Sequence, residues 1–361
     1  MGQFIGQKVE LVWNKGIAAL CDWRFPDEFP DGKSYSPVPE YAGALWSFDL
    51  PDSLISDPSA CRKIEDGDLV WVRLSWLRSF VRQVLPLVKA NFVLVTGDSD
   101  SCVPSELGPE ARAVLDCSKV VHWYTQDYDG SGPLERISPV PIGIDFHMIS
   151  ERPFWGEAEA SALEQERTLV SIGKSFPPLQ ARLQRVYADF GWQRGFGRYG
   201  CYRDFGVYRR FHPLEGTSFH ESRRQLLKEL RRNELVYCQP GPLPRREMWR
   251  RQGEYAFVLS PHGHMGLDSQ RTWEALALGH IVLAPSSSVD SLYVDLPVVP
   301  LKSWNEITPE NLEKWLSLYS NDGATHEKLR SSYWVNQMRS RVQERCSRQA
   351  AFANVPVSPA L

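Results

Sequence analysis

The 361-residue sequence contains no apolar stretch long enough to cross a membrane and no apolar core of a signal peptide near its amino terminus. A membrane-spanning helix needs about twenty mostly apolar residues, so no integral membrane segment is expected. Gly6 stands where an N-myristoylation motif requires Ser or Thr. The net charge is only −3, which makes neither nucleic acid nor an acidic membrane surface an expected partner.

Cysteines occur without any Cys-x-x-Cys pair, and their number, seven, is odd. This number argues against a closed disulfide framework, and the spacing argues against a zinc site. The sequence also lacks any Asn-x-Ser/Thr glycosylation site. The cytoplasm is therefore the expected compartment, and an excised lumenal catalytic domain that has lost its acceptor sites is the alternative.

The length exceeds what one hydrophobic core usually organises. With 42% hydrophobic residues the chain can form two cores. We expect an N-terminal Rossmann-like domain over residues 1–150, a second domain over residues 151–330, and a C-terminal helix and tail over residues 331–361 that pack back on the first domain. The Glu-rich segment 147–165 is the expected linker.

The first half alternates short apolar runs with helical patterns, which predicts an α/β fold. The expected strands are residues 9–13, 68–73, 92–96, 120–123 and 140–144, and the expected helices are residues 74–90 and 109–115. The segment 22–51 is rich in Pro, Gly and aromatic residues and is expected to be a long ordered loop.

The second half begins with an apolar run at 169–172, which predicts a strand, followed by Gly173-Lys174 and an amphipathic pattern over 179–190 that predicts a helix. Gly173 and Lys174 are therefore candidate phosphate ligands, although a P-loop would need another glycine before them. A plain surface lysine is the alternative. The Arg- and Tyr-rich segment 193–216 is either an acceptor-facing insertion or a surface loop. Helices are expected at 312–318 and 334–342, after a strand at 298–299.

The most informative segment is residues 255–284, which places a strand, a polar loop, a helix and a second strand in thirty residues. The buried run Tyr255–Leu259 predicts a parallel strand. Ligands bind beyond the carboxyl ends of such strands, and the polar residues expected there are Ser260, His262, Gly263 and His264. Asp268 and Ser269 are candidate caps of the next helix and candidate donor ligands.

Arg271 and Glu274 are three residues apart on this predicted helix and therefore share a face. A helix N-terminus favours a diphosphate, and Arg271 adds a planar set of donors to it. Glu274 can accept hydrogen bonds from the hydroxyls of a ribose or sugar. The alternative is an exposed ion pair between the two.

These motifs carry a resemblance to the carboxyl-terminal half of exostosin-like glycosyltransferases. It rests on Leu259-Ser-Pro-His-Gly, Asp268-Ser-Gln-Arg-Thr-Trp-Glu-Ala-Leu, Gly279-His-Ile-Val, Asp295-Leu-Pro-Val-Val and Trp304. The resemblance implies a GT-B fold, two Rossmann-like domains facing a central cleft. It also implies transfer of a sugar from a nucleotide diphosphate donor, with Arg271 on the diphosphate and Glu274 on the sugar or ribose. Family members usually sit in the Golgi lumen behind a membrane anchor, which this sequence lacks.

Asp98-Ser99-Asp100 follows the predicted strand at 92–96. In GT-A glycosyltransferases such a motif holds a divalent metal against the donor. With the donor signature in the second half, two explanations need no metal. The residues form the turn after Gly97, or Asp98 or Asp100 acts from the opposite domain as the general base. Other candidate bases at strand or loop ends are Asp22, Asp127 and Asp145. His122 and His147 are candidates too, with a structural role as the alternative because a lone histidine beside aromatic residues is more often structural.

Gly266 lies eight positions before Glu274, where retaining GT-B enzymes often carry a second glutamate. We therefore expect inversion, with a UDP-sugar as donor, a glycan or glycoconjugate as acceptor, and His262 and His264 stabilising the leaving diphosphate. The alternatives are a non-catalytic nucleotide-sugar or glycan-binding protein, an epimerase, and a metal-dependent GT-A-like transferase.

Overall fold

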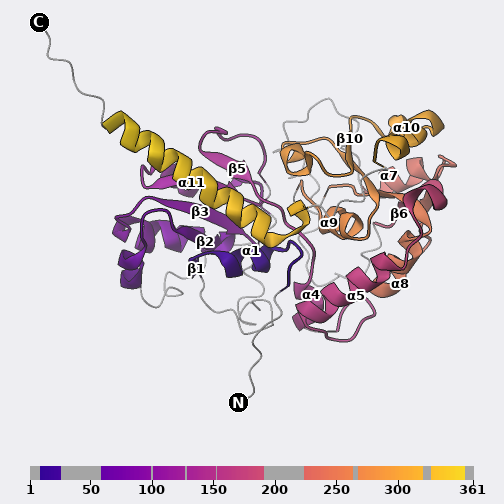
Figure 1. Ribbon diagram of the computed structural model, residues 1–361, viewed down its shortest axis with the longest axis horizontal. Coiled ribbons are helices and arrows are strands. Elements are labelled where there is room, and N and C mark those ends of the chain that lie inside the picture. Colours follow the sequence, from indigo (N-terminus) through magenta and orange to yellow (C-terminus); the bar gives the residue numbers. More distant parts are fainter. Residues whose placement is uncertain are drawn as a thin grey trace, which may run out of the picture.

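A computed structural model describes residues 9–25, 58–98, 101–126, 128–151, 153–190, 223–262, 267–319 and 327–353. These residues form two lobes side by side, each built on a five-stranded parallel sheet (Figure 1). The first sheet has the order β1-β2-β3-β4-β5, and its strands are β1 (Trp23–Phe25), β2 (Leu69–Arg73), β3 (Phe92–Gly97), β4 (Val120–Thr125) and β5 (Ile137–Pro139). The second has the order β10-β9-β8-β6-β7, with β6 (Leu183–Ala188), β7 (Val236–Cys238), β8 (Tyr255–Leu259), β9 (Ile281–Pro285) and β10 (Val298–Leu301).

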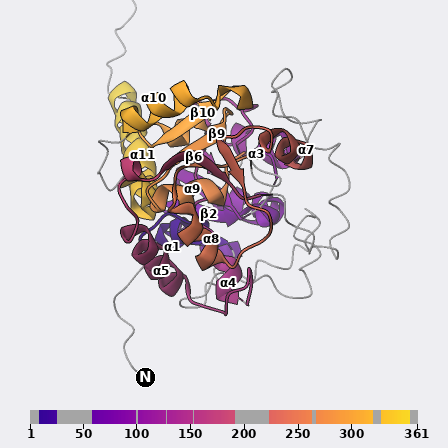
Figure 2. The same ribbon diagram turned by 90° about the vertical axis from the view of Figure 1, so that its right-hand side faces the viewer.

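Helices cover these sheets. Strands β2, β3, β4, β8 and β9 are buried at every residue, as expected for parallel strands with both faces covered. The helices are α1 (Asn14–Leu20), α2 (Leu77–Ser79), α3 (Pro109–Asp116), α4 (His147–Glu151), α5 (Ala162–Lys174), α7 (Arg223–Leu230), α8 (Arg245–Gln252), α9 (Gln270–Ala277), α10 (Pro309–Tyr319) and α11 (Ser331–Ala353). In Figure 2, α9 lies next to the second sheet and α10 runs above it, and both contact β9.

Each lobe has a hydrophobic cluster of its own, and a third cluster among the described residues extends across both lobes. The shared cluster includes Trp13 and Phe146 from the first lobe and Trp249 and Trp273 from the second. Helix α11 follows the second lobe in sequence but packs on α1, β3 and β4 of the first (Figure 1). Two Rossmann-like domains with a carboxyl-terminal helix crossing back constitute the GT-B arrangement, so the expected fold class is confirmed.

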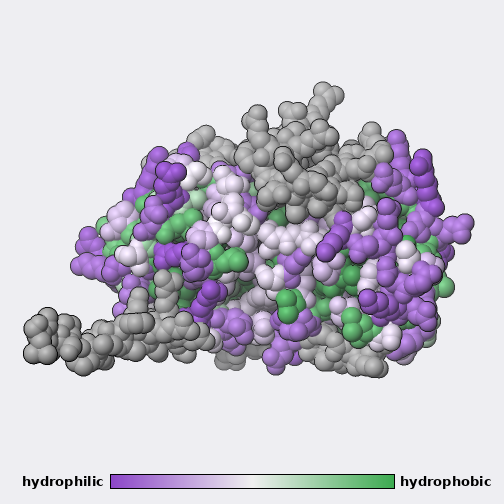
Figure 3. All heavy atoms as spheres, turned by 90° about the horizontal axis from the view of Figure 1, so that it is seen from above, coloured by the Kyte–Doolittle hydropathy of each residue, from purple (hydrophilic) through white to green (hydrophobic). Residues whose placement is uncertain are grey.

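The surface seen from above is hydrophilic at both ends of the molecule (Figure 3). Among the described residues on that face, hydrophobic side chains form small separate patches. No helix of the described residues is long and apolar enough to cross a membrane.

Several local expectations are wrong. Residues 169–172 belong to helix α5, which starts at a capping box in which Ser161 and Glu164 bond each other's backbone N–H groups. Residues 183–188 of the expected helix 179–190 form strand β6, because the apolar residues there fit either period and pairing with β7 and β8 decides.

In the first lobe, residues 9–13 and 140–144 make only isolated bridges, such as Trp13 with Gly143, instead of strands. The expected helix over residues 74–90 is a succession of short helical turns of different pitch, ending at residue 87. Strands β1 and β5 were not expected. The segment 193–216 and residues 26–51 lie outside the described residues.

Candidate functional site

The second sheet has a topological switch point between β6 and β8. The chain crosses from β6 to β7 on one side and from β8 to β9 on the other, so these two connections diverge at the carboxyl ends of β6 and β8. Open α/β sheets bind ligands at this place. Asp189 directly follows β6, and Ser260 directly follows β8.

Arg271 lies in the first turn of α9, beside this switch point. Its side chain is partly exposed, and it makes no hydrogen bond or ion pair with any described residue. Asp189 is its electrostatic neighbour: burial raises the pKa of that carboxyl group, and Arg271 opposes the rise. A cation and a carboxylate therefore lie together at the carboxyl edge of the sheet. The sequence pattern does not indicate Asp189 as a site residue, because it predicts a helix over 179–190 in place of β6.

Ser260 and His262 lie at the end of β8, as expected. The Ser260 hydroxyl is buried and bonds Thr272 Oγ1 at 2.8 Å, which ties the end of β8 to α9. His262 is partly exposed, and its Nδ1 lies 3.1 Å from the carbonyl oxygen of Leu267. Gly263 and His264 lie outside the described residues.

Asp268, a candidate helix cap and donor ligand, takes part in a buried hydrogen-bond network instead. Its buried carboxylate accepts hydrogen bonds from Ser269 N, Trp273 Nε1 and the Tyr293 hydroxyl, and from Ile142 N of the chain that leaves the first lobe. With four protein donors around it, this carboxylate joins the lobes and does not face a ligand.

Ser269 occupies the N-cap position of α9, but its side chain makes no capping bond. The first turn of α9 thus lacks a side-chain cap. The Thr272 N–H donates to the Ser269 carbonyl oxygen, whereas the N–H groups of Gln270 and Arg271 are left to a ligand or water.

The Glu274 carboxylate is likewise hydrogen-bonded to protein side chains. Its carboxylate accepts hydrogen bonds from Arg245 at 2.5 Å and from Trp249 Nε1 at 3.0 Å. Arg245 is buried between the rings of Trp155 and Trp249 and also donates to Gln165 at 2.9 Å. The alternative of an exposed ion pair between Arg271 and Glu274 is therefore wrong, since Glu274 pairs with Arg245. Nothing in the sequence distinguishes Arg245 from the neighbouring arginines of α8.

Gly173 and Lys174 form the last turn of α5, at the far end of the helix from its N–H groups. Gly173 packs near Leu278, and the Lys174 side chain is exposed. A helix C-terminus carries partial negative charge and disfavours a phosphate. The strand and turn from which their phosphate role was inferred do not exist, so the surface-lysine alternative fits this geometry better.

Asp98 follows β3 with a left-handed backbone conformation, φ 61°. Its carboxylate pairs with two buried cations, Lys15 and Arg73, the latter at 2.9 Å. Burial alone would raise the pKa of Asp98, but these cations hold it well below its usual range. The carboxylate is thus a counterion and a weak proton acceptor. Asp100 lies outside the described residues, and no group of His, Cys, Asp and Glu in the described part of the chain could hold a metal ion.

Replacing Asp98 with Asn should lower stability, because it leaves Lys15 and Arg73 buried beside each other without a compensating charge. We expect a loss of about 2 kcal/mol in the free energy of unfolding, measured by urea denaturation. Wild-type stability together with reduced turnover would instead restore Asp98 as a base.

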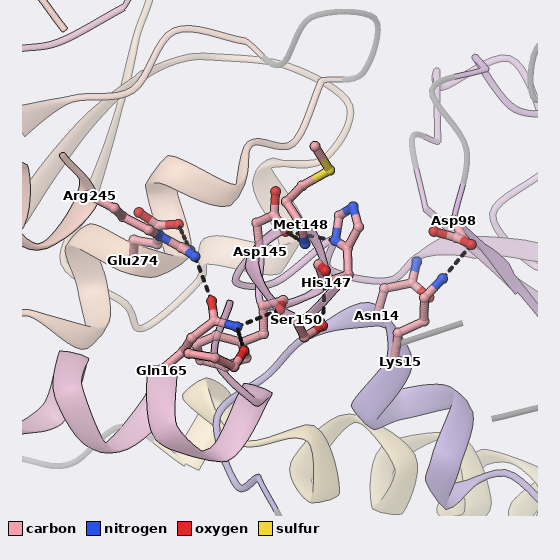
Figure 4. A network of polar contacts seen from close by, with 12 residues as sticks. Asn14, Lys15, Asp98, Asp145, His147, Met148, Ser150, Gln165, Arg245 and Glu274 are labelled. Atoms are coloured by element: carbon pink, nitrogen blue, oxygen red, sulfur yellow. Dashed lines mark hydrogen bonds and ion pairs between the residues drawn. The ribbon is translucent and has the colours of Figure 1, made fainter. Parts of the chain in front are cut away.

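A histidine and an aspartate lie between the two lobes, at the start of α4. His147 Nδ1 lies 2.7 Å from Asp145 Oδ1; the Asp145 side chain is 4% exposed and that of His147 is 30% exposed. Figure 4 shows the pair between Glu274 and Arg245 of the second lobe and Asp98 and Lys15 of the first.

Of the remaining candidate bases, the two that the structure describes are hydrogen-bonded to other protein groups. Asp22 bonds Arg339 of α11 and the backbone N–H of Leu69. His122 is buried within the first sheet, with its Nε2 2.9 Å from Ser138 Oγ. Asp127 lies outside the described residues.

Comparisons with known proteins give similarity of structure alone. No family model and no curated protein sequence match the chain. An α,α-trehalose 6-phosphate synthase from Burkholderia multivorans is 12% identical with a TM-score of 0.36, over 90% of this chain and 79% of the other. A UDP-forming α,α-trehalose-phosphate synthase from Burkholderia vietnamiensis is 14% identical with a TM-score of 0.36, over 90% and 80%. An E. coli protein bound with UDP-2-fluoro glucose is 11% identical with a TM-score of 0.32, over 86% and 75%. Similarities at this level carry no argument about activity.

Proposed function

We propose that the protein is a glycosyltransferase that binds a nucleotide diphosphate sugar at the carboxyl edge of its second sheet. The observation that carries this proposal is Arg271, which lies beside the switch point at the uncapped start of α9 without an ion-pair partner among the described residues. A diphosphate satisfies both the guanidinium and the helix N-terminus. The sugar then passes to a hydroxyl of a glycan or other acceptor held against the first lobe.

Asp189 takes the role that the sequence suggested for Glu274. It directly follows β6, close enough to Arg271 for the two charges to interact, whereas both Glu274 oxygens accept hydrogen bonds from Arg245 and Trp249. A carboxylate at this place can accept hydrogen bonds from the vicinal hydroxyls of the ribose or the transferred sugar.

We propose UDP as the nucleotide of the donor. A thermal-shift panel of UDP-, GDP-, TDP- and CMP-linked sugars tests both donor binding and the preference for UDP. A ligand that binds only the native state raises the melting temperature by mass action. The UDP-sugars should give the largest shift, and turnover of the selected sugar should release UDP. Binding without turnover would favour a non-catalytic binding protein, and formation of an epimer without UDP would favour an epimerase.

Donor binding should not require a metal, because Arg271 and the α9 N-terminus supply the positive charge. We expect excess EDTA to change the UDP dissociation constant less than twofold, as measured by calorimetry. A chelator-sensitive affinity that Mn²⁺ restores would place the donor at Asp98 and Asp100 and would overturn the proposed site.

A further inference from the structure

The Asp145–His147 pair has the geometry of a base and its orienting carboxylate. The carboxylate is almost fully buried and lies 2.7 Å from Nδ1, while the imidazole is 30% exposed. A carboxylate on Nδ1 fixes the tautomer in which Nδ1 carries the proton and Nε2 is the basic atom. A proton taken up at Nε2 is then stabilised by the carboxylate beside it.

The pair also lies between charged groups of the two lobes. Asp145 feels the charge of Arg245 on α8 of the second lobe. His147 feels Lys15 on α1 and Asp98 after β3, both of the first lobe. In Figure 4 the imidazole lies on the side of the pair that faces Asp98 and Lys15. The ring therefore lies between the lobe proposed to hold the acceptor and the lobe proposed to hold the donor.

Local helix capping explains only part of this geometry. Asp145 Oδ1 also accepts from Met148 N at 3.2 Å, as expected at the start of a helix such as α4. That contact alone would not require a histidine at position 147. Asn at position 145 preserves the capping oxygen but removes the charge, so one substitution separates the two roles.

We propose that His147, oriented by Asp145, is the general base of the transfer reaction; this inference rests on the proposed function. The acceptor hydroxyl gives its proton to His147 Nε2 while its oxygen forms a bond to the anomeric carbon of the donor. The bond from that carbon to the diphosphate oxygen breaks, and the electron pair leaves with the nucleoside diphosphate. Attack opposite the leaving group inverts the anomeric configuration. Asp98 keeps Lys15 and Arg73 neutralised and takes no proton.

The pH dependence follows from the charges around the ring. Burial alone would lower the pKa of His147, but Asp145, helped by Asp98 and opposed by Lys15, raises it above its ordinary value of about 6.5. A general base acts when deprotonated, so kcat/KM should fall as the pH drops through this raised pKa. Removing the carboxylate should move the acid limb to lower pH.

The test compares His147→Gln and Asp145→Asn with Ser150→Ala, a control that removes a hydroxyl bonded to the His147 carbonyl oxygen within α4. The readout is hydrolysis of whichever of UDP-glucose, UDP-galactose and UDP-glucuronic acid stabilises the protein most, with water as acceptor. We expect His147→Gln to lower kcat about 100- to 10,000-fold with unchanged UDP affinity. Asp145→Asn should lower kcat and shift the acid limb downward, and Ser150→Ala should resemble the wild type.

The configuration of the first-formed sugar, followed by NMR before it equilibrates, tests the same inference without a variant. Inversion is expected. Retention, wild-type kcat in His147→Gln, or an unshifted acid limb in Asp145→Asn would each overturn the role of His147 while leaving the donor site intact. A wild-type protein that neither binds UDP nor releases it from any of these sugars would overturn the proposed function itself.

Discussion

Arg271→Ala should weaken UDP binding about 10- to 100-fold, because charge-assisted hydrogen bonds contribute about 1.5–3 kcal/mol and each 1.4 kcal/mol is tenfold in affinity. The fold should survive the substitution. The Arg271 side chain makes no hydrogen bond or ion pair with described residues, and α9 is held by buried neighbours such as Trp273 and Leu276.

Calorimetric titration of UDP into the wild type and the variant measures this effect. Arg250→Ala is the matched control, since Arg250 is an exposed arginine on α8 that takes no part in the proposed site. It should bind UDP as the wild type does. A folded Arg271→Ala protein with wild-type affinity would remove Arg271 from the diphosphate site.

Arg245→Ala should lower the free energy of unfolding by about 3–5 kcal/mol, because it leaves the Glu274 carboxylate buried without its cation. The substitution also empties the space between Trp155 and Trp249. Urea denaturation measures the loss as a lower midpoint. The adjacent Arg246→Ala is the control: Arg246 is exposed in its pair with Glu157, so we expect at most about 1 kcal/mol.

The double variant Arg245→Met, Glu274→Leu extends this test. Replacing both members of a buried ion pair with apolar residues is often nearly neutral, so the double variant should recover much of the stability lost in Arg245→Ala. If Glu274→Gln abolished UDP-sugar turnover without lowering stability, Glu274 would be a donor ligand after all and the structural role would be contradicted.

The sequence predicted those features that depend on local pattern. The apolar run Tyr255–Leu259, followed by Ser260 and a helix, favours a buried strand with a polar carboxyl end, and the structure has this arrangement. Two α/β domains followed from the length and the alternation of elements. By contrast, β6 is a strand only because β7 and β8 pair with it, and the residues of β6 alone do not encode those partners.

The site was predictable only where neighbours in sequence are also neighbours in space. Arg271 lies at the expected end of α9, but the partner of Glu274 is Arg245, which is 29 residues away and resembles the other arginines of its helix. Asp98 looked like a catalytic carboxylate because Lys15, 83 residues earlier, could not be placed beside it. His147 looked like a lone histidine. Its position between the lobes depends on how α1, α4 and α8 are arranged in space, which the sequence alone does not show.

Photo-cross-linking with 5-azido-UDP, mapped by mass spectrometry of tryptic peptides, tests most directly whether the donor binds the second lobe. The carboxyl end of β8 and the start of α9 fall in residues 252–271. We expect the nucleotide on this peptide, with labelling suppressed by excess UDP and unaffected by EDTA. Labelling of residues 90–112, which contain Asp98 and Asp100, would place the donor in the first lobe and contradict the account.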